Sequence, residues 1–358
     1  MPSDAGDASW RVGDRTEGEL IARIRTHLPP PPPWMVVGIG DDAAVVEPER
    51  NRVEVLSVDA LVEGIHFDRA FTPARAIGHR ALAANLSDLA AMGAAPRLAL
   101  LSFALPADLP LHDFDAIVSG IATLAAEHGL HIAGGNLTRS PGPLVIDITV
   151  IGSVKRRQAL TRSGARAGDE IYVSGTIGGA AAGLQMLQAS GFNTKDTKAR
   201  TDLEEGFSSV SLVSFVSEHC IDRYLHPTPR IRMGLLLSRN RAARACMDLS
   251  DGLADAVRQI AETSRVGAII DAAALPIDAS ARRWFEARGA DAIDAAIAGG
   301  DDYELLIGVR PQLRRRLKAT RDAGAALTCI GTFTADRALI IRRAEGDTPL
   351  PRGYSHFR

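Results

Sequence analysis

Apolar positions along the chain switch repeatedly between a period of two and a period near 3.6, which predicts alternating strands and helices. The strand-like runs are rich in β-branched residues, and the helical runs begin at residues that can cap a helix. This alternation is typical of an α/β protein, and we expect a domain boundary near residue 155, where a first α/β unit closes. The segment 36–46 predicts a strand that ends in an acidic turn; the other predicted strands are 53–58, 98–105, 144–154 and 171–175, and the predicted helices include 16–28, 72–93 and 113–128.

The stretch 85–96, NLSDLAAMGAAP, places a carboxylate in a helix that otherwise looks buried. Thr72 can cap this helix, Pro73 can occupy its first position, and Gly93 can end it. The residues at helical spacing from Asp88 include no cation. If Asp88 is interior, it needs positive charge from elsewhere, for example from a bound metal ion, because an isolated buried carboxylate is costly. If Asp88 points into water from a half-exposed face, it needs no partner.

Acidic residues also occupy four turns next to predicted strands. One acidic turn is usually an ordinary turn, because Asp and Gly favour turns for local reasons. Four such turns together with Asp88 favour a cation site, and hard oxygen donors without an EF-hand loop favour Mg²⁺ over Ca²⁺. In the third turn Ser250 is expected to cap the following helix. The acidic residues are Asp41 and Asp42 in the first turn, Asp59 at the end of the predicted strand 53–58, Asp248 and Asp251 in the third turn, and Asp301 and Asp302 in the fourth.

Two glycine-rich segments offer places for a phosphate. Gly134 and Gly135 let the backbone approach a ligand closely, and the polar side chains that follow them suit phosphate. The Thr-Ile-Gly-Gly turn at 176–179 opens an Ala-rich helix, whose free amides can hold an anion. A tight turn made of glycine because strand and helix pack closely is an equally good interpretation of that segment.

Composition excludes several classes of function. The 358 residues are 46% hydrophobic with a net charge of −2, so the chain can bury a sizeable core and has no basic field for nucleic acid. No signal peptide or membrane helix is evident, which predicts a cytoplasmic protein without a membrane partner. The isolated cysteines Cys220, Cys246 and Cys329 are expected in the core. No P-loop and no protein-kinase HRD or DFG motif is present. Residues 1–15 predict a disordered tail and 193–209 a mobile loop.

Several segments, in one order, resemble the motif series of the thiamine-monophosphate kinase family. The resemblance implies ATP-dependent phosphorylation of thiamine monophosphate to thiamine diphosphate, in the two-domain fold of aminoimidazole ribonucleotide synthetase. It implies an N-terminal domain at 16–155, which binds ATP and Mg²⁺ and forms a dimeric β-barrel in a homodimer, and a C-terminal α/β domain at 156–358. The segments are GIGDDAAVV, SVDALVEGIHF, NLSDLAAMGAAP, AGGNLTR, LTRSGARAGDEIYVSG, HPTPRI, MDLSDG, GGDDYEL and GYSHF.

The resemblance also implies roles for individual residues, with Asp59 and Asp88 as the catalytic carboxylates. In such a kinase the acceptor is already a phosphate oxyanion, so positioning and charge neutralisation carry catalysis and no nucleophilic side chain is required. The implied Mg²⁺ ligands are Asp42, Ser57, Val58, Asp59, Asp88, Asn136, Asp248 and Asp251. The implied ATP contacts are Gly135, Asn136, Arg162 and Ser250, and the implied thiamine-phosphate contacts are His66, Asp301 and Tyr354.

The chain departs from the family pattern at two of its motifs. The usual GGDTT is GGNLT here, so Asn136 replaces a metal-binding Asp, and the usual STDT is SVDA, so Val58 and Ala60 lack hydroxyls. The Asn136 side-chain carbonyl and the Val58 backbone oxygen can still coordinate a cation. The alternatives are a relative with a different acceptor and a non-catalytic sensor of nucleotide or thiamine phosphates. Selenophosphate synthetase is disfavoured because no reactive Cys or Lys lies near the N-terminal glycines.

Overall fold

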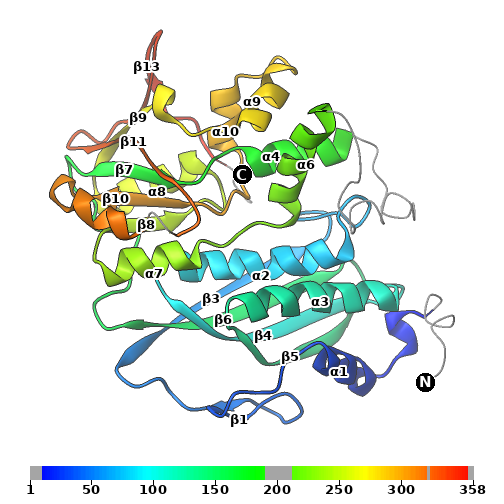
Figure 1. The fold of residues 1–358 in the computed structure, drawn as a ribbon. Helices are drawn as coiled ribbons and strands as arrows, with labels where there is room; N and C mark the ends of the chain where they lie inside the picture. The colour runs from blue at the N-terminus through cyan, green and yellow to red at the C-terminus, as the bar shows by residue number, and fades with distance from the viewer. Residues whose placement is uncertain (1–9, 190–211, 321–322, 354–358) are drawn as a thin grey trace. The chain divides into compact units, whose positions relative to one another are not determined.

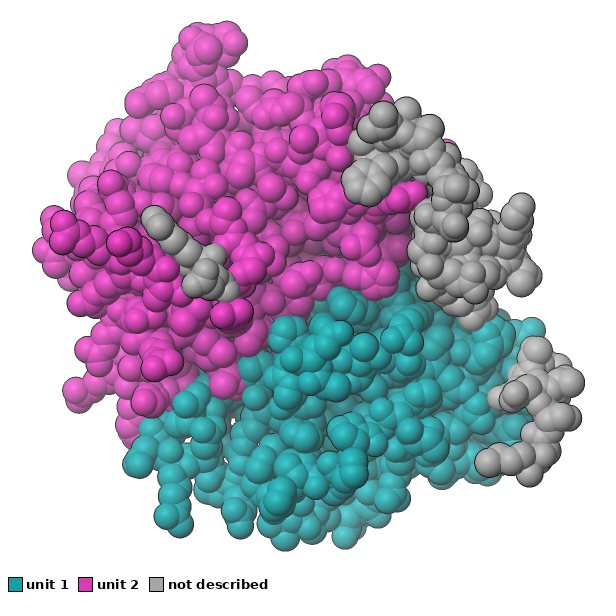
Figure 2. All heavy atoms as spheres, viewed as in Figure 1, with its two compact units in different colours: residues 1–85, 96–153, 192–208 teal, residues 86–95, 154–191, 209–358 magenta. Residues whose placement is uncertain are grey.

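The computed structural model of the protein describes residues 10–189, 212–320 and 323–353 (Figure 1). The predicted loop 193–209, residues 1–9 of the predicted tail and Tyr354 lie outside these ranges. The described chain divides into two compact units (Figure 2). One of the boundaries between them falls inside the helix α2, after Asn85. Unit 1 contains residues 10–85 and 96–153, and unit 2 contains residues 86–95, 154–189, 212–320 and 323–353.

Unit 1 is built on an open four-stranded sheet in the order β3-β6-β4-β5, with β3 and β5 at its edges. β1 and β2 form a separate antiparallel pair, and the described strands of this unit form no closed barrel. Its elements are η2 (Val12–Asp14), α1 (Glu17–Thr26), β1 (Met35–Val37), β2 (Val45–Val46), β3 (Arg52–Val62), the first part of α2 (Ala74–Ala91), β4 (Ala95–Pro106), α3 (Leu111–Glu127), β5 (His131–Ser140) and β6 (Val145–Lys155).

The helices of unit 1 follow from local sequence and close packing. Thr16 caps α1, and its reciprocal hydrogen bonds with Glu19 confirm the predicted capping box. α2 and α3 approach closely because each contributes a glycine where they touch. A Cβ on Gly78 of α2 would lie 2.0 Å from the Ile117 carbonyl oxygen, and one on Gly120 of α3 would meet the α2 backbone at 2.1 Å. A larger residue at either glycine would therefore push the two helices apart.

The strands of the unit 1 sheet bury one face and leave apolar side chains on the other. In β6, fully buried Ile146, Ile148 and Val150 alternate with partly buried residues, as the predicted period of two requires. On the edge strand β3, Leu56 and Val58 remain 63% and 57% exposed. Neighbouring exposed apolar side chains of this size mark a candidate interaction surface.

Unit 2 is built on a seven-stranded sheet in the order β13-β12-β9-β11-β7-β10-β8, antiparallel except where β12 meets β9. Its core packs strand residues such as Val173 and Phe333 against α8 residues such as Val257. Its elements after α2 are β7 (Glu170–Ser174), α4 (Gly179–Ala189), α6 (Leu212–Leu225), α7 (Ile231–Arg239), β8 (Ala245–Asp248), α8 (Leu253–Ser264), β9 (Gly267–Asp271), η3 (Ala272–Ala274), α9 (Ala279–Glu286), α10 (Ala292–Ala298), β10 (Leu305–Val309), η4 (Pro311–Thr320), β11 (Leu327–Thr334), β12 (Leu339–Arg343) and β13 (Gly346–Pro349).

Two predictions, one about the N-terminal residues and one about a cysteine, are wrong. Residues 10–15 are not part of a disordered tail, because Val12 is buried and its amide donates to the Leu109 carbonyl at 2.9 Å. Cys329 is exposed, whereas the other two cysteines are buried as expected. None of the described helices is long and apolar enough to cross a membrane.

Candidate active site

The third and fourth acidic turns lie side by side in unit 2. β8 ends at Asp248 and pairs with β10, which begins directly after the fourth turn. The Asp301 amide donates to the Ser250 carbonyl at 2.8 Å, and the Tyr303 amide donates to the Leu249 carbonyl at 3.2 Å. Backbone hydrogen bonds therefore join two acidic turns that are far apart in the sequence.

Glycines permit the close contact between these turns. A Cβ on Gly252 would lie 2.6 Å from the Gly299 carbonyl oxygen, and one on Gly300 would lie 2.5 Å from the Ser250 carbonyl oxygen. Gly252, with a φ of 92°, is the N-cap residue of α8, and no side chain caps that helix. The prediction that Ser250 caps α8 is therefore wrong, because the chain enters the helix through a left-handed glycine.

The end of α2 brings two further residues to this part of unit 2. Ser87 is fully buried, and its Oγ donates to the Asp248 Oδ2 at 2.8 Å. α7 holds the helix in place, because Gly234 lets the two backbones meet: a Cβ there would lie 2.0 Å from the Ala90 carbonyl oxygen. Asp88 is only partly buried, although Ala84, Asn85 and Ala91, at helical spacing from it, are buried. Its carboxylate therefore lies neither in the interior nor fully in water, and its role as a metal ligand stays a prediction.

The C-terminal segment and α8 carry the remaining predicted positions of unit 2. Gly353, the residue before Tyr354, packs on the start of α8, where a Cβ would lie 3.0 Å from the Asp251 carbonyl oxygen. The segment that leads to Tyr354 thus passes beside the third acidic turn. Arg162 contacts α8 further along the helix, because its Nη1 donates to the Gln259 Oε1 at 2.7 Å.

In unit 1, β3 carries Ser57, Val58 and Asp59 in consecutive positions. The prediction that Asp59 ends its strand is wrong, because the alternating pattern continues and β3 runs to Val62. Asp59 is partly buried and Val58 is exposed, as expected for neighbours on opposite faces of a strand. Just beyond β3, the His66 Nδ1 accepts a hydrogen bond from the Val62 amide at 3.0 Å. A neutral His66 therefore carries its proton on Nε2.

The first acidic turn and β5 hold the other predicted positions of unit 1. Asp41 and Asp42 are both exposed, and the Asp41 Oδ1 accepts a hydrogen bond from the Asp42 amide at 2.9 Å. In β5, a Cβ on Gly135 would lie 1.8 Å from the Leu101 carbonyl oxygen of β4. Pairing with β4 therefore requires this glycine whether or not a ligand also approaches it. Asn136 follows and is exposed.

Two of the predicted Mg²⁺ ligands of unit 1 lie at opposite edges of its sheet. Asp59 is on β3 and Asn136 is on β5, three strand spacings apart. At about 4.8 Å per spacing, they are separated by about 14 Å along the sheet. Among the residues that the structure describes, no group of three His, Cys, Asp or Glu side chains is placed to hold a metal ion. One copy of unit 1 therefore does not bring these two ligands to a single ion.

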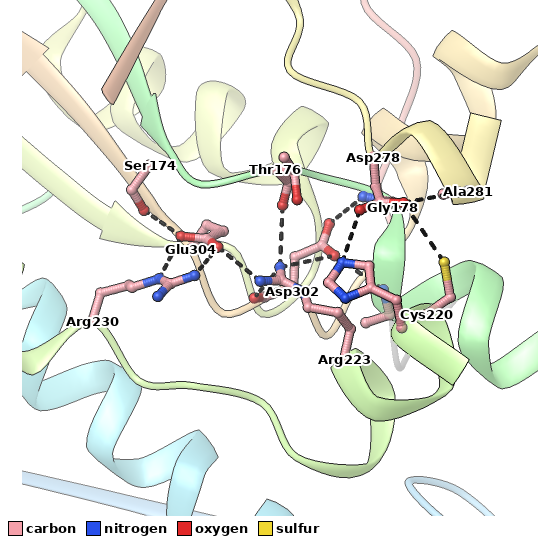
Figure 3. A network of polar contacts seen from close by, with 12 residues as sticks. Ser174, Thr176, Gly178, Cys220, Arg223, Arg230, Asp278, Ala281, Asp302 and Glu304 are labelled. Atoms are coloured by element: carbon pink, nitrogen blue, oxygen red, sulfur yellow. Dashed lines mark hydrogen bonds and ion pairs between the residues drawn. The ribbon is translucent and has the colours of Figure 1, made fainter. Parts of the chain in front are cut away.

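The glycine-rich turn before α4 is filled by one of the protein's own carboxylates (Figure 3). The Asp302 side chain accepts hydrogen bonds from the Gly178 amide at 2.6 Å and from the Ala180 amide at 3.2 Å. These amides belong to the N-terminus of α4, where a carboxylate is favourable. The turn at 176–179 is therefore a packing turn that binds one of the protein's own carboxyl groups. Burial raises the pKa of the Asp302 carboxyl to about 7, although Arg223 and both amides lower it.

A second buried carboxylate, Glu304, has partners that no local sequence pattern indicates. Its side chain accepts hydrogen bonds from the Ser174 hydroxyl at 2.5 Å, the Arg230 Nε at 2.7 Å and the Arg223 Nη1 at 3.1 Å. Arg223 also lies 3.8 Å from the Asp302 carboxylate. We call these four charged residues, Asp302, Glu304, Arg223 and Arg230, the buried ion network (Figure 3). Its two arginines come from α6 and from the residue that precedes α7.

Family comparisons match most of the chain. Residues 40–154 match the AIR synthase related protein, N-terminal domain, and residues 166–343 match the AIR synthase related protein, C-terminal domain. The chain thus belongs to the class of AIR synthase related proteins, which have two α/β domains.

Relatives that align with nearly the whole chain identify one family within this class. Thiamine-monophosphate kinase of Escherichia coli (strain K12) is 37% identical over 345 residues, which cover 95% of this chain and 98% of that protein. The crystal structure of thiamine-monophosphate kinase from Stenotrophomonas maltophilia K279a has a TM-score of 0.77 and 38% identity, covering 91% of this chain and 96% of the other. AaThiL complexed with AMPPCP and TMP has a TM-score of 0.72 and 28% identity, covering 98% and 99%. The chain belongs to the thiamine-monophosphate kinase family of enzymes, which confirms the resemblance in its motifs.

Proposed function

We propose that this enzyme transfers the terminal phosphate of ATP to thiamine monophosphate, giving thiamine diphosphate and ADP. The observation that carries the proposal is the junction of the third and fourth acidic turns with Ser87 at the end of α2. This junction gathers several implied metal and substrate residues in one part of unit 2. The complex of the relative AaThiL with AMPPCP and TMP supports ATP and thiamine monophosphate as the substrate pair.

The transfer requires only two bond changes. An oxygen of the acceptor phosphate attacks the γ-phosphorus of ATP, and the bond from that phosphorus to the β,γ-bridging oxygen breaks as ADP leaves. Because the acceptor oxygen is already ionised near neutral pH, we propose direct in-line transfer without a covalent enzyme intermediate. The chain's task is then to align two anions and to lower their repulsion.

Mg²⁺ fits the donors that the chain offers, since all of them are hard oxygens of carboxylates, a hydroxyl, an amide or the backbone. Several Mg²⁺ ions, when bound, would neutralise phosphate charge. The His66 Nε2–H is suited to donate to the acceptor phosphate, and the Asp301 carboxylate is suited to the positive thiazolium ring. Gly135, Arg162 and Ser250 would contact the nucleotide, and Tyr354 the thiamine. The residues that would hold Mg²⁺ are Asp42, Ser57, Val58, Asp59, Asp88, Asn136, Asp248 and Asp251.

We further propose that the enzyme works as a homodimer whose N-terminal domains, residues 16–155, join their sheets into a barrel. The exposed Leu56 and Val58 of the edge strand β3 supply an apolar surface for this contact. The separation of Asp59 from Asn136 across one sheet supports the same arrangement. Joined edges would let Asp59 of one copy meet Asn136 of the other, which one copy alone does not achieve.

Mixing two inactive variants tests the dimer. Asp59→Asn and Asn136→Ala chains, unfolded and refolded together, form mixed dimers that hold one intact site if the two residues act across the interface. Random mixing then restores about a quarter of the wild-type activity. No recovery, in a mixture shown to contain mixed dimers, would place both residues in one subunit's own site.

A coupled assay of ADP release with ATP, Mg²⁺ and thiamine monophosphate tests the function itself. We expect ADP release that depends on all three components and thiamine diphosphate as the product. Binding of thiamine monophosphate without ADP release would instead identify a sensor. Release with a different phosphorylated acceptor, and none with thiamine monophosphate, would identify a relative with another substrate.

A further inference from the structure

The fourth acidic turn is held in a backbone conformation that ordinary residues rarely adopt. Asp301 and Tyr303, on either side of Asp302, have φ angles of 65° and 49°. Non-glycine residues in this left-handed region persist only where the surrounding structure enforces them, and they gather at functional sites. The contacts that hold this turn therefore bear on what it does.

The turn is fixed from its buried side by the buried ion network. The Asp302 carboxylate docks on the N-terminal amides of α4, and Glu304, two residues on, is clamped by Arg230 and Arg223 (Figure 3). Asp302 and Glu304 are 4% and 0% exposed, whereas Asp301 is only partly buried. The two neighbouring aspartates thus occupy different environments, one in the core and one toward the surface.

The Asp301 carboxylate has a partner within the same turn. The Tyr303 hydroxyl donates to the Asp301 Oδ1 at 3.1 Å, and Tyr303 itself is only 7% exposed. A buried ring is a rigid support for its hydroxyl, and a hydrogen bond from it restricts the carboxylate to a narrow range of orientations. Packing alone would explain why the Tyr303 ring is buried. It does not explain why the hydroxyl donates to Asp301, the carboxylate that we propose contacts the acceptor.

We propose that Tyr303 is a positioning residue, whose hydroxyl orients the Asp301 carboxylate toward thiamine monophosphate while the buried ion network fixes the turn beneath it. This inference rests on the proposed function, in which Asp301 contacts the acceptor. It predicts that Tyr303 governs affinity for the acceptor and has little effect on the nucleotide, because it acts only through Asp301.

The experiment compares Tyr303→Phe with Tyr172→Phe. Tyr172 is a matched control, because it is also nearly buried in unit 2 and its hydroxyl also donates to a carboxylate, that of Glu170 at 2.9 Å. Both changes keep the ring and remove one hydroxyl. We expect Tyr303→Phe to raise the KM for thiamine monophosphate about tenfold, the worth of one hydrogen bond to a charged group. The KM for ATP and kcat should change less than about twofold in both variants.

A double-variant comparison separates positioning from general damage. In an Asp301→Ala background, Tyr303→Phe should add no further loss of thiamine-monophosphate affinity, because the group through which Tyr303 acts is gone. Calorimetric binding of thiamine monophosphate in the presence of AMPPCP gives the same comparison without turnover. An additive loss, an equal rise of both KM values, or an unchanged KM for thiamine monophosphate in Tyr303→Phe would overturn the inference.

The same binding experiment distinguishes this inference from the proposed function. If the wild type binds thiamine monophosphate but releases no ADP, kinase activity fails while the tenfold difference in affinity still supports the role of Tyr303. If the wild type is an active kinase and Tyr303→Phe binds normally, only the role of Tyr303 is overturned. If the wild type binds no thiamine monophosphate at all, both are overturned.

Discussion

Replacing Arg230 with Met should destabilise unit 2 strongly, because it removes the closest cation from a fully buried carboxylate. Glu304 is 0% exposed, and the Arg230 guanidinium donates to both of its carboxylate oxygens. Breaking a buried ion pair by removing one partner costs about 3–5 kcal/mol, since the remaining charge stays in the core. Ser174 and Arg223 still donate to Glu304, so we expect the lower end of that range, about 3 kcal/mol.

Calorimetry and chemical denaturation measure this loss. For a folding unit of 150–250 residues, each kcal/mol lowers Tm by about 2–4 °C, so the Tm of Arg230→Met should fall by about 6–12 °C. Arg314→Met is the matched control, because Arg314 also pairs with a glutamate, Glu170, through two nitrogens, but its side chain is 62% exposed. Its Tm should stay almost unchanged.

A second variant shows that the loss comes from the stranded charge. In Arg230→Met combined with Glu304→Gln, the buried site loses both members of the pair, and part of the stability should return. The reasoning is refuted if Arg230→Met and Arg314→Met lower Tm equally, or if neutralising Glu304 makes the Arg230→Met protein still less stable. Either result would mean that Glu304 does not carry an uncompensated charge in the core.

Three further outcomes follow from the structure. Burial raises the pKa of Asp302 to about 7, above its unfolded value, so its contribution to stability is full below about pH 4 and is lost as pH rises through 7. Between about pH 4 and 7, Asp302→Asn should therefore flatten the pH dependence of the unfolding free energy by about 1 kcal/mol per pH unit. Equal slopes in the variant and the wild type would contradict this. Asp88→Asn should abolish phosphoryl transfer without lowering Tm in Mg²⁺-free buffer, because it removes one of several carboxylates that repel one another when no cation is bound; near-normal turnover would disprove this. Asn136→Asp should lower the Mg²⁺ concentration needed for half-maximal activity at saturating substrates, because a carboxylate attracts the ion more than an amide does; an unchanged midpoint would mean that position 136 does not face the metal.

The features that the sequence predicts well are those with a local signal. The capping box of Thr16 and Glu19, the helix α2, and the strands flanking the acidic turns all depend on residues that are close together in the sequence. The predicted cap of α2 is wrong, however, because the buried Thr72 Oγ1 has no hydrogen-bond partner among the described residues. The motifs also occur in the same order as in one enzyme family, and this order is sufficient to identify the family. Local propensity and family pattern together thus account for the elements and the class of enzyme.

The predictions that fail are those where a distant partner determines the structure. Asp59 looks like a turn residue, but pairing within the sheet continues β3 past it to Val62. Gly135 is singled out in the sequence only for a ligand, whereas the neighbouring strand by itself also excludes a side chain there, so its contact with a nucleotide stays a prediction. Arg223 lies 81 positions from Glu304 in the sequence, and no periodic pattern links the two. Such partners are set by topology, which short-range patterns do not encode.

The Asp301–Asp302 pair shows how one motif divides between function and fold. In the sequence the two carboxylates are equivalent, and both could be assigned to a cation or to a turn. The left-handed backbone at Asp301 separates their side chains, and the open N-terminus of α4 captures only Asp302. Because the Asp302 carboxyl oxygens already accept hydrogen bonds from the first amides of this helix, the helix does not compete for Asp301. The glycine-rich turn that resembled a phosphate site thus serves the active site indirectly, by fixing the carboxylate next to the one that we propose contacts the substrate.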